Sequence, residues 1–194
     1  MIRSFLTTIL LAAFSAGPLR AEIPASAEAP KAADAAPVAL ADADGPPEHQ
    51  GSRRVVPQGD DGVILLHARD ASVHGGTLRY EPIEAKNTIG YWFKLEDWVS
   101  WEFTVAKAGE YSVEVLQGCG KGDGGGNVEV SAGGKVLPFV VEDTGGFQNF
   151  KARVIGTVTL AEGKQTLAIK ARTRPGVAVV DIRQVTLRPA EAKP

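Results

Sequence analysis

Two pairs of neighbouring carboxylates are the first candidates for chemistry in this 194-residue sequence: Glu96-Asp97 and Glu142-Asp143. A glycosidase needs two carboxyl groups on opposite sides of a cleft, roughly 5–9.5 Å apart, whereas acidic residues beside turns are common on protein surfaces. The sequence has no GxSxG elbow, no Walker loop, no HExxH and no CxxC pair, and these motifs mark frequent reaction types. The residues therefore do not predict an enzyme, although sequence alone leaves the arrangement of the carboxylates open.

A glycine-rich run from Gly118 to Gly126 resembles a phosphate-binding loop only in composition. It lacks the Gly-Lys-Ser/Thr ending, and no helical pattern follows that would direct backbone amides at a phosphate. We interpret the run as a turning loop between strands. Cys119 lies within it and is the only cysteine, and all three histidines are far upstream. We therefore predict a small buried hydrophobic residue at this position and not a nucleophile.

Aromatic and amide side chains gather at two expected loops: Tyr91 and Trp92 after Ile89-Gly90, and Phe147, Gln148, Asn149 and Phe150 after Gly145-Gly146. Pyranose sugars have apolar C–H faces that stack on aromatic rings, and their hydroxyls hydrogen-bond with planar polar groups. Two rings on neighbouring loops would hold one sugar between them. Because side chains alternate along a strand, we expect about half of these rings to point into the core.

The elements that must position these residues are strands. From Trp98 to Val105, apolar residues fall at every second position, which is typical of a strand with one buried face. Similar extended runs alternate with glycine-rich turns, and no segment of ten or more residues in this region keeps a helical period. The expected runs are Val63–Ala68, Gly76–Glu81, Ile89–Phe93, Glu110–Gln117, Asn127–Ser131, Lys135–Glu142, Arg153–Leu160, Gln165–Ala171 and Val177–Leu187. They predict an all-β protein, an antiparallel β-sandwich or jelly roll, with an up-and-down barrel as the alternative.

The chain divides by composition into four parts. Residues 1–21 read as a secretory signal peptide, with Arg3 before a short apolar run, and an uncleaved anchor is the alternative. Residues 22–60 are rich in alanine and proline and predict a disordered linker. Residues 61–189 form the predicted β-sandwich domain, and residues 190–194 form a tail. The formal charge of −2 with no basic stripe gives no reason to expect nucleic acid.

From Val63 to Leu187, the chain resembles the galactose-binding-like β-sandwiches of family 6 and family 35 carbohydrate-binding modules. The motifs that carry the resemblance are Ile89-Gly90-Tyr91, Glu96-Asp97-Trp98-Val99-Ser100-Trp101, Ala108-Gly109-Glu110-Tyr111-Ser112-Val113, Thr144-Gly145-Gly146-Phe147-Gln148-Asn149-Phe150 and Val179-Val180-Asp181-Ile182. The stretch from Asn87 to Gly120 also resembles domains appended to secreted bacterial sulfatases. The sulfatase catalytic domain and its Cys-x-Pro-Ser-Arg signature are missing from this sequence.

The resemblance implies a glycan partner, held between Tyr91 and Phe147. Trp92, Gln148 and Asn149 complete the predicted ligand-binding set. A valine, Val179, stands where the family has a polar residue that is usually asparagine.

The resemblance also implies a structural calcium ion, held partly by a Glu-Ala-Glu on the first strand and by an aspartate on the last. Here the first strand reads His67-Ala68-Arg69, while Asp181 remains. Calcium binds oxygen ligands and an arginine repels it. We therefore expect no calcium and no other cofactor, and we predict a structural ion pair between Arg69 and Asp181 in its place.

Together these patterns predict an exported, non-catalytic carbohydrate-binding module that stacks a sugar between loop aromatics. The expected location is secreted or periplasmic, with no membrane span after signal cleavage. The alternative from a different class is a structural or protein-interaction β-sandwich of the cell envelope without sugar binding. An enzyme is a third possibility. The residues do not identify the sugar.

Overall fold

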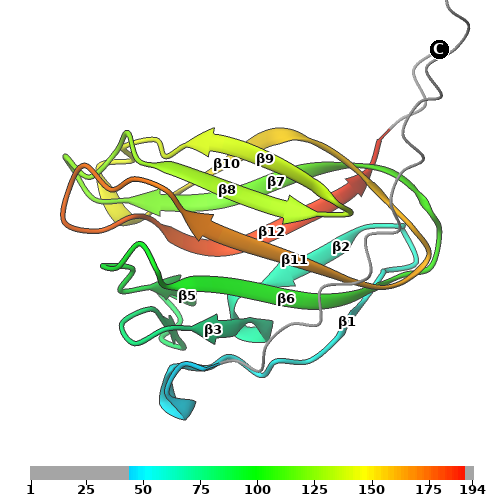
Figure 1. Cartoon of the computed structure of the whole chain (residues 1–194), viewed down its shortest axis with the longest axis horizontal. Coiled ribbons are helices and arrows are strands. Elements are labelled where there is room, and N and C mark those ends of the chain that lie inside the picture. The colour runs from blue at the N-terminus through cyan, green and yellow to red at the C-terminus, as the bar shows by residue number, and fades with distance from the viewer. Residues whose placement is uncertain (1–43, 191–194) are drawn as a thin grey trace, which may run out of the picture. The chain divides into compact units, whose positions relative to one another are not determined.

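The computed structural model describes residues 44–190, which fold into a sandwich of two six-stranded sheets. The first sheet has the order β1-β6-β11-β8-β9, and β3 also pairs with β6, so that β3 and β11 flank β6 in Figure 1. Its strands are β1 (Val56–Pro57), β3 (Ser72–His74), β6 (Trp98–Val105), β8 (Asn127–Ala132), β9 (Lys135–Val140) and β11 (Gly163–Ala171). All of its pairings are antiparallel except that of β1 with β6.

The second sheet has the order β10-β7-β12-β5-β4, and β2 also pairs with β12. All of its pairings are antiparallel. Its strands are β2 (Ile64–His67), β4 (Arg79–Glu81), β5 (Thr88–Gly90), β7 (Gly109–Cys119), β10 (Gly146–Leu160) and β12 (Asp181–Pro189). The predicted all-β sandwich is confirmed.

The core lies between the sheets and follows the alternation seen in the sequence. Val99, Trp101, Phe103 and Val105 on β6 are each 0% exposed. The indole nitrogen of Trp101 donates a 2.8 Å hydrogen bond to the carbonyl of His67, so burial of this polar group is compensated. β6 is paired along both edges and is therefore a central strand of the first sheet, and its inward face contributes to the core.

Several expected elements have different bounds. The run predicted as Ile89–Phe93 is a strand only to Gly90, because Tyr91 adopts a positive φ of 58° and turns the chain. The strand predicted to begin at Arg153 instead begins at Gly146. Two short strands, β1 and β3, were not predicted. With only two and three residues, they are too short to show a period in sequence.

The folded domain begins before the predicted boundary at residue 61. The side chain of Gln50 donates a 2.9 Å hydrogen bond to the carbonyl of Val73 and accepts a 2.8 Å bond from its amide. A 3-10 helix, η1 (Pro47–His49), precedes it. Residues 44–60 of the predicted linker therefore pack on the sandwich. The signal peptide, the remainder of the linker and the last four residues of the tail lie outside the described residues.

The described part of the chain contains no helix with the length and apolar character needed to cross a bilayer. Cys119 is fully buried and free, as predicted for a small hydrophobic residue. Burial, followed by the nearby carboxylates Asp123, Asp143 and Asp181, raises the pKa of its thiol to about 11. A thiol in this state is a poor nucleophile at neutral pH.

Candidate functional site

A groove of about 220 Å³ opens where β5 ends and where β10 and β12 begin. We call it the loop groove. Three of the five predicted ligand-binding residues, Tyr91, Phe147 and Gln148, line it together. The full lining set is Glu81, Lys86, Tyr91, Phe93, Phe147, Gln148, Ala178 and Asp181. The structure thus brings into one place residues that lie more than fifty positions apart in the sequence.

The Tyr91 side chain reaches the groove because its backbone leaves the strand. Its φ of 58° lies in the left-handed region, which is costly for a bulky residue and is found at sites under structural or functional demand. The ring is 37% exposed. The guanidinium carbon of Arg79 lies 3.3 Å from the ring centroid, and the ring of Phe93 meets Tyr91 edge-on at 5.8 Å. The ammonium group of Lys86 also lies over this ring, with its Nζ 5.6 Å from the centroid.

Trp92 was predicted to bind ligand, and the structure shows that this prediction is wrong. The side chain is 0% exposed. Its indole nitrogen donates a 3.1 Å hydrogen bond to the carbonyl of Asp97, and its own carbonyl accepts a 2.9 Å bond from the amide of Val179. The turn at Tyr91 sends this ring into the core. Phe93, the next residue, is 40% exposed and reaches the groove instead.

Phe147 takes its place by packing on the glycine-rich loop. A Cβ atom on Gly120 would lie 2.7 Å from Cε2 and 2.8 Å from Cζ of the Phe147 ring, which is closer than real Cβ contacts allow. Only glycine lets the ring lie flat against the chain at this point. Gly120 of the glycine-rich run therefore leaves the space in which the Phe147 ring packs, and this ring forms one wall of the loop groove.

The amide residues that follow Phe147 have different places. Gln148 lines the loop groove and is exposed. Asn149 is also exposed but does not line the groove, and its Nδ2 donates a 3.2 Å hydrogen bond to the carbonyl of Thr144. Its position indicates a role in holding the 144–149 turn. The predicted ligand contact at Asn149 is not supported by this arrangement.

A charged cluster in the loop groove was missed by the sequence interpretation. Asp181, at the start of β12, is 5% exposed and lines the groove together with Glu81 and Lys86. Lys86 Nζ lies 2.7 Å from Glu81 Oε1. Burial, and secondly the negative charge of Glu81, raise the pKa of Asp181 to about 8, and the positive charge of Lys86 only partly opposes them. A carboxyl group that holds its proton near neutral pH is a hydrogen-bond donor as well as an acceptor.

The predicted ion pair between Arg69 and Asp181 is wrong. Arg69 does not lie on a strand but in a 3-10 helix, η2 (Ala68–Asp70), and its Nε lies 3.8 Å from the carboxylate of Asp70. The charged neighbours that shift Asp181 are Glu81 and Lys86. The chain turns after β2, so the arginine side chain points toward a different hollow.

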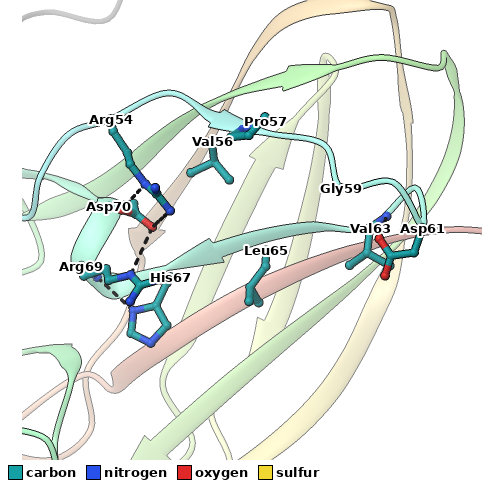
Figure 2. A pocket seen from close by; sticks show the side chains of 10 residues that line it. All are labelled: Arg54, Val56, Pro57, Gly59, Asp61, Val63, Leu65, His67, Arg69 and Asp70. Carbon is teal, nitrogen blue, oxygen red and sulfur yellow. Dashed lines mark hydrogen bonds and ion pairs between the residues drawn. The ribbon is translucent and has the colours of Figure 1, made fainter.

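That second hollow, which we call the edge hollow, has a volume of about 370 Å³ and lies between β1 and β2 (Figure 2). Arg54 Nε donates a 2.7 Å bond to Asp70 Oδ1, and Ser52 donates to the same oxygen at 3.0 Å. Figure 2 shows Arg54 and Arg69 both directed at the Asp70 carboxylate. Both arginines of the edge hollow are therefore paired with the same carboxylate, that of Asp70. Among the described residues that line the edge hollow there is no phenylalanine, tyrosine or tryptophan, and the imidazole of His67 is the one aromatic ring present.

The residues present do not fit the structural calcium ion that the resemblance implies. Asp70, the carboxylate nearest the first strand, is already bonded to the guanidinium group of Arg54 and lies beside that of Arg69. Within residues 44–190, no cluster of three or more histidine, cysteine, aspartate or glutamate side chains is placed to hold a metal ion. Calcium prefers six to eight oxygen ligands, and two guanidinium groups stand where such ligands would be needed.

Val179, which replaces the polar residue of the family, is 1% exposed and does not line the loop groove. It precedes Asp181 by two positions, so the side chain at the start of β12 that does reach the groove is a carboxyl.

Of the comparisons with known proteins, the one with family models identifies a family. A family model described as carbohydrate binding module (family 6) matches residues 73–189. No curated protein sequence matches the chain significantly. Among solved structures, 86 chains match significantly.

Three of the solved structures illustrate the likeness. A family 35 carbohydrate binding module from Clostridium thermocellum superposes with a TM-score of 0.54 at 15% identity, covering 66% of this chain and 98% of that one. The C-terminal family 6 module of LamC, a marine laminarinase from Zobellia galactanivorans, gives a TM-score of 0.52 at 20% identity, with coverages of 65% and 98%. The Podospora anserina GH26-CBM35 β-(1,4)-mannanase gives 0.51 at 18% identity, covering 69% of this chain but only 29% of the mannanase. At these identities the structures show a shared fold.

Proposed function

Since the chain belongs to the family 6 carbohydrate-binding modules, we propose that the loop groove is its sugar-binding site and that Tyr91 and Phe147 stack on the sugar. The module is non-catalytic and its ligand is carbohydrate, as the family implies. The loop groove would be the place of binding, and Tyr91 and Phe147 would be the residues that contact the sugar. The observation that carries this proposal is that these two rings, one directly after β5 and one near the start of β10, line one open groove.

The size and lining of the loop groove support a single sugar ring. Sites for drug-sized ligands usually measure about 300–1,000 Å³, and the loop groove, with about 220 Å³, is smaller. Aromatic walls would contact the apolar face of the ring. Gln148 and the carboxyl of Asp181 would exchange hydrogen bonds with its hydroxyls, which provides the few placed polar groups that such sites use for orientation.

We further propose that the protein is exported and acts in the periplasm or outside the cell. The support is the signal-peptide pattern of residues 1–21, followed by the alanine- and proline-rich stretch that would tether the module. The glycan-binding module would then hold the protein on a polysaccharide or glycoconjugate. Detection of the mature N-terminus after export tests this part separately.

The binding proposal is tested on a glycan array with the purified protein and three variants. Tyr91→Ala and Phe147→Ala should each weaken binding of the glycans that the wild type recognises by tenfold or more, since stacked rings contribute about 0.5–1.5 kcal/mol beyond the area they bury. Trp98→Ala is the matched control. Trp98 is a partly exposed ring on β6, stacked on His74 and outside the loop groove.

Binding that survives both groove variants but disappears with Trp98→Ala would move the site to the outer face of the first sheet. A wild-type protein that binds no glycan at all would favour a structural sandwich instead. Circular dichroism melting of each variant ensures that a loss of binding is not a loss of fold.

A further inference from the structure

The loop groove holds one more carboxyl group than the positive charge beside it can match. Asp181 is 5% exposed, and no described residue donates a hydrogen bond to its carboxyl oxygens, so burial and charge alone set its ionisation. Its charged neighbours are Glu81 and Lys86. Lys86 is committed to Glu81, with a separation of 2.7 Å between Nζ and Oε1. One ammonium group therefore faces two carboxyl groups.

The free oxygens of these two carboxyl groups converge on the backbone of Gly90. A Cβ at this position would lie 2.8 Å from Glu81 Oε2 and 3.1 Å from Asp181 Oδ1. Only a glycine leaves room for both oxygens, and Gly90 immediately precedes Tyr91, the aromatic wall of the groove. The converging oxygens and the ring thus belong to one small space.

Two other cationic side chains lie near the groove, and neither is paired with Asp181. The Arg79 guanidinium lies over the Tyr91 ring at 3.3 Å. Arg183 donates a 2.8 Å hydrogen bond to the carbonyl of Lys86 and lies 4.2 Å from the ring centroid of Phe150. Since neither guanidinium is paired with Asp181, the second carboxyl group has no protein cation of its own.

Three kinds of positive charge could neutralise the carboxylate of Asp181: a proton, a metal ion or a cationic ligand. A proton is the default in the free protein, because burial raises the pKa of Asp181 to about 8. Calcium binds six to eight oxygen ligands, and the described residues provide no cluster of three or more histidine, cysteine, aspartate or glutamate side chains for a metal ion of any kind. An organic ammonium group needs fewer acceptors and is also attracted by the faces of aromatic rings.

We propose that the loop groove prefers a sugar with a free amino group, a hexosamine whose ammonium group pairs with Asp181 while its ring stacks on the aromatic walls. This inference rests on the proposed sugar site and adds the class of sugar. Acetylation of the amine removes the charge and leaves the ring unchanged, so an N-acetylhexosamine is the matched neutral ligand.

The experiment is isothermal titration calorimetry near pH 7 with a glucosamine tetramer and with its fully N-acetylated counterpart. The wild type should bind the glucosamine tetramer about tenfold more tightly, which is the size of a hydrogen bond to a charged group. Asp181→Asn should remove this preference and should still bind the acetylated tetramer. Glu84→Gln is the matched control, since Glu84 is an exposed acidic residue that does not line the groove, and it should keep the preference.

Equal affinity of the wild type for both tetramers, or a preference that persists in Asp181→Asn, would overturn the inference. If the acetylated tetramer binds and Tyr91→Ala abolishes that binding, the sugar site stands and only the amino-sugar preference falls. If neither tetramer nor any glycan of the array binds the wild type, the proposed site and the preference fall together. A melting curve of Asp181→Asn that matches or exceeds the wild type shows that the variant is folded.

Discussion

Replacing Asp181 with asparagine should stabilise the fold, and the gain should grow with pH. The carboxyl is 5% exposed, and burial, followed by the charge of Glu81, raises its pKa from 3.8 to about 8. Because the pKa in the folded state lies above that of the unfolded chain, the folded state binds the proton more tightly. This favourable contribution is complete below about pH 3.8 and is lost as the pH rises to about 8.

The size of the effect follows from the same two pKa values. Each unit of separation between them corresponds to about 1.4 kcal/mol of free energy. The cost of ionising Asp181 in the folded protein is therefore at most about 6 kcal/mol above pH 8, and relaxation of the groove and entry of water reduce it. We expect a gain of about 2–4 kcal/mol for Asp181→Asn at pH 8 and little gain near pH 4, since an asparagine of similar shape has no proton to lose.

The assay is urea denaturation of the wild type and of Asp181→Asn between about pH 4 and pH 8.5, with Glu84→Gln as the control for removing an exposed charge. The other titratable groups contribute equally to both proteins, so the difference between their free energies of unfolding reports the titration of Asp181. If the difference in the free energy of unfolding stays constant across this pH range, the idea that Asp181 is a buried acid without a partner is refuted. An Asp181→Asn protein less stable than the wild type at pH 8 would refute it as well.

Three further changes test the packing around the loop groove. Trp92→Ala should lower the free energy of unfolding by about 3–5 kcal/mol, because the ring is fully buried, and a wild-type urea midpoint would contradict its place in the core. Gly120→Ala should displace the Phe147 ring, because the new Cβ would lie 2.7 Å from its Cε2. Isothermal titration calorimetry should then show weaker glycan binding. Unchanged affinity would mean that this contact does not fix the position of the ring. Asp97→Ala should destabilise the fold mainly above about pH 4. Burial opposes ionisation of Asp97, but hydrogen bonds from Thr77 and its neighbours outweigh burial and hold the pKa of Asp97 below its ordinary value. The stabilisation by the ionised carboxylate is therefore lost as the pH falls through that pKa. Equal destabilisation by Asp97→Ala at pH 3 and pH 7 would argue against this.

The strands were predictable wherever a local pattern was long enough to carry a period. The eight residues of β6 show four alternating apolar positions, and all four are buried. The pairing partners of β6 could not be predicted, because β3, β11 and β1 come from distant parts of the chain and meet only in the folded sheet. The early start of the domain was missed for a related reason, since residues 44–60 dock through side chains such as Gln50 and not through a repeating pattern.

The aromatic half of the candidate site was predictable, and the charged half was not. Tyr91 and Phe147 stood beside glycines at expected turns, which is a signal that sequence can show. Trp92 was misplaced because it was grouped with Tyr91 beside the same expected loop, whereas the chain turns at the left-handed backbone of Tyr91 and the Trp92 ring is buried. Asp181 was singled out as the aspartate that remains of the family's calcium site but was given the wrong partner, since the chain enters a 3-10 helix at Ala68 and Arg69 lies at the edge hollow.

The departures from local preference gather at the loop groove. Gly90 is the last residue of β5, and a glycine is required there because two carboxyl oxygens lie where a Cβ would stand. Tyr91 has a backbone that its side chain disfavours, and Asp181 is buried without a hydrogen-bond donor. Each of these costs stability, and the core elsewhere follows its pattern closely. Sequences retain such costs where a ligand recovers them, so the meeting of all three around one aromatic groove is an independent reason to look for the ligand there.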